Sequence, residues 1–398
     1  MMFLEFFIWG AWFVTLGTFL VNNLKATDGE IALAFSTQSW GAIIAPFVIG
    51  IIADRYFNAE RILGILHLLG AVLMYFMYQS TEFNAFYLLV MGYMILYMPT
   101  LALVNSVSFN QMKNPAKEFS MVRVFGTAGW IIAGLSISYI FNWDQGENIG
   151  DGLLRNTFLM TAIASCILGV FSFTLPKTPP KAKSANKLNL KEILGLDSLS
   201  LFKDKNFLIF FISSVLICIP LAFYYQNANP FLVEVGMDNP TGKMTLGQIS
   251  EIAFMLLLPY FFTKFGFKKT ILVAMAAWVV RYLLFAFGDV EELGFMLIIG
   301  IALHGICYDF FFVSGQIYTD SKAGEKFKSS AQGLITLATY GLGMLIGFWV
   351  AGKISTAYLL NDGNHVWGTI WLYPAGFALV VFLLFAIFFK TEKIDYQS

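Results

Sequence analysis

The sequence predicts an all-α polytopic membrane protein with about twelve transmembrane helices in two pseudo-symmetric six-helix halves. Of its 398 residues, 58% are hydrophobic and only 13% are charged. Apolar runs of about 18 or more residues recur from end to end, and each is long enough to cross about 30 Å of hydrocarbon. These runs are continuous and separated by short polar connections, which favours helices over the alternating strands of a membrane barrel.

The apolar runs set the expected positions of the spans. They lie near residues 2–21, 32–53, 61–79, 83–107, 121–142, 153–175, 206–230, 245–263, 270–288, 293–317, 330–352 and 367–389.

Basic residues predict the orientation of these spans. Connections after even-numbered spans carry most of them, namely Arg55, Arg61, Lys113, Lys117, seven lysines from Lys177 to Lys205, Lys264, Lys268, Lys269, Lys322, Lys326 and Lys328. Far fewer lie on the opposite side, among them Lys25, Arg155 and Lys243. By the positive-inside rule, we expect both termini in the cytoplasm.

One long polar break divides the chain. Residues 176–205 are expected to form a cytoplasmic linker between an N-terminal six-helix bundle, residues 1–175, and a C-terminal bundle with a short cytoplasmic tail, residues 206–398. The second part of the linker, KLNLKEILGLDSLSLFK, predicts an amphipathic helix lying on the membrane surface. Six spans on each side of a basic linker is typical of transporters that bind substrate at mid-membrane between two halves.

The loop after the second span reads GIIADRYFNAER and contains Gly50, Asp54, Arg55 and Arg61. It resembles the G-x-x-x-D-R-x-x-x-x-R signature of the major facilitator superfamily. A glycine permits close helix approach, and the charged groups can link helices at the cytoplasmic surface, so we expect these residues to gate the conformational change. The alternative is an ordinary positive-inside loop.

A more specific resemblance runs through nearly the whole chain. The segments MFLEFFIWGAWFVTLGTFL, YMPTLALVNSVSF, VRVFGTAGW, NPFL, GQISE, AWVVRYLLFAFGD, YDFFFVSG and SAQG occur in order and are similar to the nucleoside/proton symporter family of the major facilitator superfamily.

Two carboxylates lie deep in apolar runs. Glu251 follows Gln248 by three residues, which places both on one helix face, and Asp309 is preceded by Tyr308 and by His304. An intramembrane acid is expensive, so each is a candidate functional residue. Aromatic rings to stack on a flat base, with amide and carboxylate groups to bind hydroxyls, suit a nucleoside.

The fifth span carries Arg123 and Thr127 one turn apart, where a cation should face a cavity or an acid. The resemblance implies that these two residues, with Gln248, Glu251 and Asp309, bind substrate or couple protons, and that an aromatic at Trp130 stacks on the base. The family also has a glutamine and an asparagine one turn apart in span seven. Here FYYQNANPFL places Gln226 in a different register, which leaves base preference open.

Each charged candidate also has a purely structural interpretation. Glu251 or Asp309 could neutralise Arg123 or Arg281, because buried ions are usually paired. We interpret Arg281 as a structural partner or as a residue snorkelling to the interface.

For three further polar residues we expect no role in coupling protons to transport. We interpret His67 and His304 as hydrogen-bonded packing residues rather than titrating switches, although His304 is also a candidate substrate contact. Glu5, near the start of span one, is interpreted as interfacial.

The resemblance thus implies import of nucleosides by proton symport across a bacterial-type cytoplasmic (inner) membrane, and we expect rocker-type alternating access with Glu251, Asp309 or both carrying the proton. A membrane potential supplies about 2.3 kcal/mol per charge per 100 mV, enough for roughly fifty-fold accumulation.

No P-loop, catalytic triad or metal-ligand spacing occurs, so we expect no enzyme activity, no metal and no cofactor beyond the coupling proton. The zero net charge indicates no nucleic acid partner, and we expect a monomer in the lipid bilayer. Alternatives are a symporter of a sugar or other polar metabolite, or a non-transporting receptor or membrane enzyme.

Overall fold

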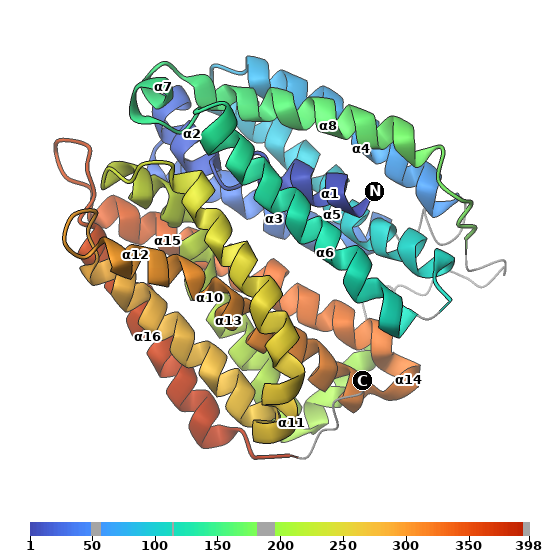
Figure 1. The fold of residues 1–398 in the computed structure, drawn as a ribbon. Helices are drawn as coiled ribbons and strands as arrows, with labels where there is room; N and C mark the ends of the chain where they lie inside the picture. The colour runs from blue at the N-terminus through green and yellow to red at the C-terminus, as the bar shows by residue number, and fades with distance from the viewer. Residues whose placement is uncertain (49–56, 114, 181–195, 393–398) are drawn as a thin grey trace. The chain divides into compact units, whose positions relative to one another are not determined.

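The computed structural model describes residues 1–48, 57–113, 115–180 and 196–392, which are almost entirely helical (Figure 1). The chain divides into two compact units, Met1–Ile193 and Leu194–Ser398.

The N-terminal unit contains six spans. Its elements are α1 (Met2–Gly10), α2 (Leu16–Leu24), α3 (Asp28–Val48), α4 (Ala59–Gln79), α5 (Phe83–Gln111), α6 (Pro115–Leu135), the π-helix η2 (Ser136–Ile140), α7 (Gly146–Gly150), η3 (Leu153–Arg155) and α8 (Asn156–Ser172).

The C-terminal unit also contains six spans. Its elements are the 3₁₀ helix η4 (Leu196–Lys203), α10 (Lys205–Glu234), α11 (Pro240–Phe287), α12 (Gly294–Ala302), α13 (His304–Tyr308), the π-helix η5 (Asp309–Val313), α14 (Ser314–Thr336), the π-helix η6 (Leu337–Gly343), α15 (Met344–Ala357) and α16 (Trp367–Phe388).

The helices agree with the predicted spans. Within the described residues, nine helical stretches are long and apolar enough to cross a membrane. One of these, α11, is broken by a non-helical backbone at Gly266 (φ 76°, ψ 169°), so it supplies two spans. The stretch α1 to α2 and the helix α3 supply two more. The prediction of an all-α protein with about twelve spans is therefore confirmed.

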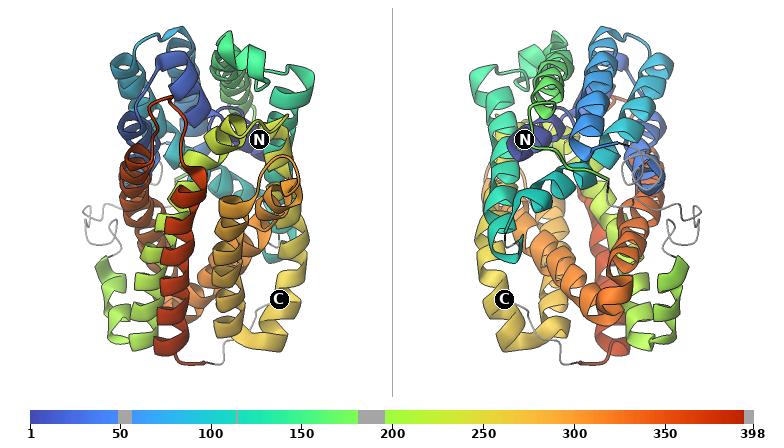
Figure 2. Two further views of the ribbon diagram at one scale, coloured as in Figure 1. Left: turned by 90° about the vertical axis from the view of Figure 1, so that its left-hand side faces the viewer. Right: turned by 90° about the vertical axis from the view of Figure 1, so that its right-hand side faces the viewer.

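Within each unit, neighbouring helices pack side by side in pairs, and Figure 2 gives two further views of the helices. In the N-terminal unit, α1 packs on α6, α4 on α8, and α3 on α5; in the C-terminal unit, α11 packs on α16 and α10 on α15. The crossing of α1 and α6 is close, because a Cβ atom at Gly129 would lie 2.1 Å from the carbonyl oxygen of Phe3. Only glycine permits this approach, which holds one face of α6 against α1.

Part of the predicted gate and linker lies outside the described residues. This applies to Gly50, Asp54 and Arg55, and to residues 181–195 of the linker. Arg61 is exposed in the first turn of α4. The gating role therefore stays a prediction.

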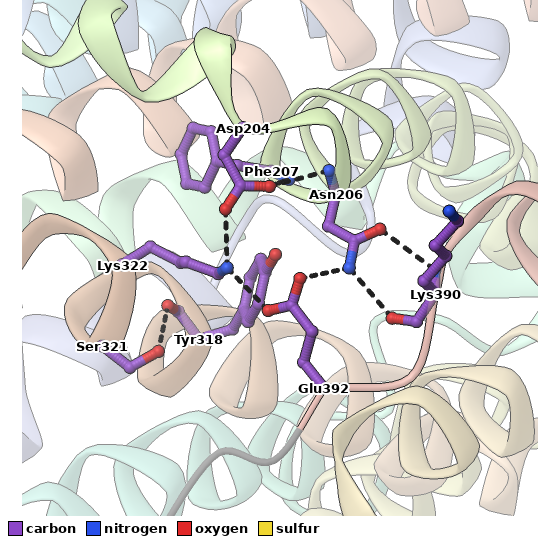
Figure 3. A network of polar contacts seen from close by, with 8 residues as sticks. All are labelled: Asp204, Asn206, Phe207, Tyr318, Ser321, Lys322, Lys390 and Glu392. Carbon is purple, nitrogen blue, oxygen red and sulfur yellow. Dashed lines mark hydrogen bonds and ion pairs between the residues drawn. The ribbon is translucent and has the colours of Figure 1, made fainter.

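A polar network fixes the first turn of α10 to the chain beyond α16 (Figure 3). The Lys322 ammonium lies 2.6 Å from Asp204 Oδ2 and 2.6 Å from Glu392 Oε2. The Asn206 side chain donates to Glu392 and to the Lys390 carbonyl oxygen, and its own oxygen accepts from the Lys390 N–H. Segments from three parts of the C-terminal unit thus meet at one end of it.

Asp204, which precedes α10 and lies outside the span, gives this network a pH dependence. Burial acts to raise its pKa, but the Lys322 ammonium and the backbone N–H groups of Phe207 and Asn206 outweigh burial and hold the pKa below its usual value. The folded protein is therefore stabilised above the unfolded-state pKa of about 3.9, and the contribution is lost as pH falls through the folded-state value.

We expect Asp204→Asn, which keeps an N-cap residue, to lower the apparent melting temperature slightly at neutral pH. The pair is partly exposed, so the loss should be under about 1 kcal/mol. Thermal unfolding across pH should show this gap closing below about pH 4, while Asp238→Asn serves as the control. A gap of equal size at every pH would contradict this account.

Candidate functional site

The candidate residues of the N-terminal unit share one face of α6. Arg123, Thr127 and Trp130 lie four and then three residues apart, and α6 packs on α1. The Arg123 guanidinium carbon stands 3.9 Å above the centre of the Phe6 ring. Trp130 is half-buried and meets Trp9 edge to face, with ring centres 5.6 Å apart. The three predicted residues thus form one continuous surface backed by aromatic rings of α1.

Arg123 has a buried donor available to a ligand. Its Nη1 is inaccessible to solvent and has no hydrogen-bond partner among the described residues. A buried unsatisfied donor costs about 1–3 kcal/mol, so such a group indicates a place where a ligand oxygen or nitrogen would be stabilised. Among the described residues of its own unit, no acid forms an ion pair with Arg123; the alternative that Glu251 or Asp309 neutralises it involves the other unit and stays a prediction.

In the C-terminal unit, Glu251, His304 and Arg281 form a linear chain of polar contacts. Glu251 Oε1 lies 3.0 Å from His304 Nε2, and His304 Nδ1 lies 3.0 Å from Arg281 Nη1. Arg281 is fully buried and stacks on Tyr224, with its guanidinium carbon 3.4 Å from the ring centre. Glu251 therefore compensates Arg281 through an imidazole, and Arg281 is not a snorkelling residue.

The chain of contacts determines which nitrogen of His304 carries hydrogen. A guanidinium only donates, so His304 Nδ1 must accept, and the proton of the neutral ring lies on Nε2. Nε2 then donates to Glu251 Oε1. A second proton on the ring would set an N–H against the N–H of Arg281. His304 therefore forms a neutral hydrogen-bonded link between Arg281 and Glu251.

A close helix crossing brings Glu251 to His304. A Cβ atom at Gly305 would lie 2.5 Å from the Ser250 carbonyl carbon and 2.6 Å from the Glu251 nitrogen. The Gly305 N–H also donates to Ser250 Oγ at 2.9 Å. Gln248, one turn before Glu251, is half-buried. The contact of α13 with α11 thus depends on glycine at this position.

We expect Gly305→Ala to separate α11 from α13, because the added methyl would meet rigid backbone. The predicted loss is about 1–3 kcal/mol of stability, and the Glu251 to His304 contact should weaken. The control is Gly333→Ala, in the same unit, where nothing lies within 4 Å of the added atom. Thermal unfolding of both variants measures the loss of stability. Equal melting temperatures for the two variants would contradict the role of Gly305.

Asp309 and Tyr308 lie where the helix changes geometry. The π-helix η5 begins at Asp309, which is 1% exposed, and such segments occur frequently at functional sites. The Tyr308 hydroxyl contacts the hydroxyl of Tyr340, which lies in the second π-helix, η6. Tyr308 also stacks on His304, with ring centres 5.7 Å apart. Tyr340 could not be selected from the sequence, because its contact with Tyr308 depends on how η6 packs.

Span seven contributes Gln226, which is 1% exposed, and its Oε1 has no hydrogen-bond partner among the described residues. The side chain of the neighbouring Asn227 already makes a hydrogen bond within the protein, because it donates to Ser355 Oγ at 3.1 Å. Tyr225 lies close enough to Tyr308 and Glu251 to interact with both electrostatically. Gln226 is therefore the amide of this segment that is available to a ligand.

One expectation from the sequence is wrong. Glu5 is not interfacial but fully buried, with its Oε2 2.8 Å from His67 Nε2 and its Oε1 2.6 Å from Thr100 Oγ1. The helices α4 and α5 supply these partners, and neither could be paired with Glu5 from sequence spacing.

The comparisons with known proteins agree with one another. A family model described as nucleoside H⁺ symporter matches residues 1–394. In Escherichia coli (strain K12), YegT, described as a candidate nucleoside transporter, is 44% identical, with 98% of this chain and 92% of that protein covered. Nucleoside permease NupG of the same organism is 31% identical, covering 98% of this chain and 95% of that one. Two crystal structures of NupG superpose with TM-scores of 0.89 and 0.86, each covering 98% of both chains.

Proposed function

Because the match extends over nearly its whole length, this chain belongs to the nucleoside H⁺ symporter family of the major facilitator superfamily, and from that premise we propose that it imports nucleosides by proton symport. It is a multi-pass membrane transporter and not an enzyme. The proposal places it in the cytoplasmic membrane with both termini inside, working as a monomer with the proton as its coupling ion. The two compact units would rock to expose the substrate alternately to each side.

The observation that carries the proposal is the chain from Glu251 through His304 to Arg281. Glu251 keeps 16% of its side chain exposed, whereas His304 keeps 3%. The carboxylate is therefore the member of the group that water or a substrate can reach. With the proton bound, Glu251 is neutral and still accepts from His304; without it, the carboxylate is balanced by the buried Arg281. Both states are tolerated, which is what a proton carrier requires.

The remaining candidates supply the contacts that a nucleoside needs. Trp130 and Tyr308 offer ring faces for the base, and Arg123 and Gln226 each hold a buried polar atom that lacks a partner among the described residues. Gln248, Thr127 and Asp309 add further polar groups for ribose hydroxyls and base edges. Asp309 is the second candidate proton carrier. Residues Gly50, Asp54, Arg55 and Arg61 are proposed to hold the cytoplasmic side closed in one state.

A competition assay tests the substrate class. We expect unlabelled uridine and adenosine to reduce the binding of labelled uridine to the purified protein, and sucrose at the same concentration to leave it unchanged. Displacement by sucrose but by neither nucleoside would favour the alternative of sugar transport on the same fold.

A further inference from the structure

The N-terminal unit contains a second buried carboxylate and imidazole, apart from the residues proposed above. Glu5 of α1 is 0% exposed and His67 of α4 is 2% exposed, and Glu5 Oε2 lies 2.8 Å from His67 Nε2. From α5, Thr100 Oγ1 lies 2.6 Å from Glu5 Oε1. The Tyr97 hydroxyl donates to the main-chain oxygen of Glu5 at 2.7 Å. Three helices thus converge on one acid.

We propose that Glu5 and His67 form a second proton-binding site, in which the carboxylate and the imidazole share the proton. Its part in transport rests on the proposed symport, but proton binding itself can be measured in the resting protein. A single unpaired charge is unstable in the buried interior of the helix bundle, so the carboxylate and the imidazole gain and lose protons as a pair. The number of protons on the pair sets its net charge.

Thr100 allows both charge states of Glu5. Its hydroxyl carries one hydrogen but lies close to two acceptors, Glu5 Oε1 at 2.6 Å and the Tyr97 carbonyl oxygen at 2.5 Å. When Glu5 is ionised, Thr100 donates to the carboxylate. When Oε1 is protonated, the acid donates to Thr100, which turns its own hydrogen to Tyr97. Neither state leaves a buried oxygen of the acid unsatisfied, so the surroundings do not select one of them.

His67 differs from His304 at its second nitrogen. In His304 that nitrogen accepts from Arg281, which excludes a second proton. In His67, Nε2 is the nitrogen that contacts Glu5, and no guanidinium among the described residues donates to the other nitrogen, so the exclusion that applies to His304 does not apply to His67.

Few other charges face the pair. The amino group of Met1 and the phenols of Tyr93 and Tyr97 interact electrostatically with Glu5, and Arg123 of α6 interacts with Tyr97. The helix α8, which also packs on α1, has no charged residue. Arg123 is thus the only arginine or lysine side chain among these described groups, and it does not contact the carboxylate.

The pair adjoins the candidate substrate face of α6. Phe6, the residue after Glu5, lies under the Arg123 guanidinium. Trp9 of the same helix contacts both Tyr97, at 5.7 Å between ring centres, and Trp130, at 5.6 Å. The charge on the Glu5 and His67 pair therefore acts on Arg123 and Trp130 over a short distance, which couples proton binding to substrate affinity within this unit.

Histidine-selective ¹⁵N NMR of the full-length protein in nanodiscs tests the proposal, because the chain has only three histidines. The His67→Gln variant assigns the His67 signal. Over a measured range of about pH 5 to pH 8, we expect the His67 signal to change with pH, and this change to occur at lower pH in Glu5→Gln, where the carboxylate that stabilises an imidazolium is absent. The His304 signal of the same sample is the control and should stay constant.

A His67 signal that does not change over this range would overturn the proposal, as would an identical midpoint in Glu5→Gln. If Glu5→Gln does not fold, Thr100→Val keeps both members of the pair and should shift the same midpoint, and an unshifted midpoint there counts against the proposal. Because these spectra need no substrate, the site stands or falls separately from nucleoside transport.

Discussion

Glu251→Gln is expected to abolish nucleoside accumulation while leaving downhill exchange of nucleoside in place. The amide accepts from His304 as the acid does, so the local hydrogen bond is kept, but no proton can be carried. Accumulation of roughly fifty-fold at 100 mV should fall to simple equilibration. Labelled uridine uptake and counterflow in the same vesicles separate the two activities.

Glu292→Gln is the matched control, because Glu292 is an exposed acid of the loop between α11 and α12. Its accumulation should equal that of the wild type. If Glu251→Gln also accumulated uridine normally, Glu251 could not be an essential proton carrier, and Asp309 would become the stronger candidate.

Arg123→Ala should weaken nucleoside binding about 10- to 100-fold, since hydrogen bonds to charged groups contribute about 1.5–3 kcal/mol. Protein stability should change little, because Nη1 has no partner among the described residues and only the stacking on Phe6 is lost. Arg123→Lys keeps the charge but not the planar donor set, so an intermediate affinity is expected. Titration calorimetry with uridine measures these affinities.

Phe125→Ala is the control on the same helix, because its ring is 62% exposed and residues two apart on a helix do not share the face on which Arg123 meets Phe6. Its affinity for uridine should match the wild type. An Arg123→Ala protein with wild-type affinity would show that the buried guanidinium is a structural group.

The sequence predicted the spans well because each depends on a local property, the length of an apolar run. The sequence also indicated Glu251 and Asp309 as candidate functional residues, because an acid inside an apolar run is unusual however the helix packs. The partner of Arg281 was only partly predictable. Neutralisation by an acid was one of the alternatives, but the imidazole between Arg281 and Glu251 depends on the crossing at Gly305.

Features that depend on tertiary packing were not predictable. Glu5 was misinterpreted because a position near a chain end indicates an interface, whereas α4 and α5 cover it completely. The π-helices at Asp309 and Tyr340 leave no periodic signal in the sequence, so the contact between Tyr308 and Tyr340 could not be inferred. The roles of these residues, and of the loop at Gly50, stay predictions.

Proton-coupled nucleoside import is tested most directly by uptake of labelled uridine into vesicles of the purified protein with an imposed proton gradient. If import is proton-coupled, uridine should accumulate above its external concentration when the outside is acidic, and should fall to equilibration when a protonophore is added. Uridine uptake of equal extent with and without the gradient would contradict it.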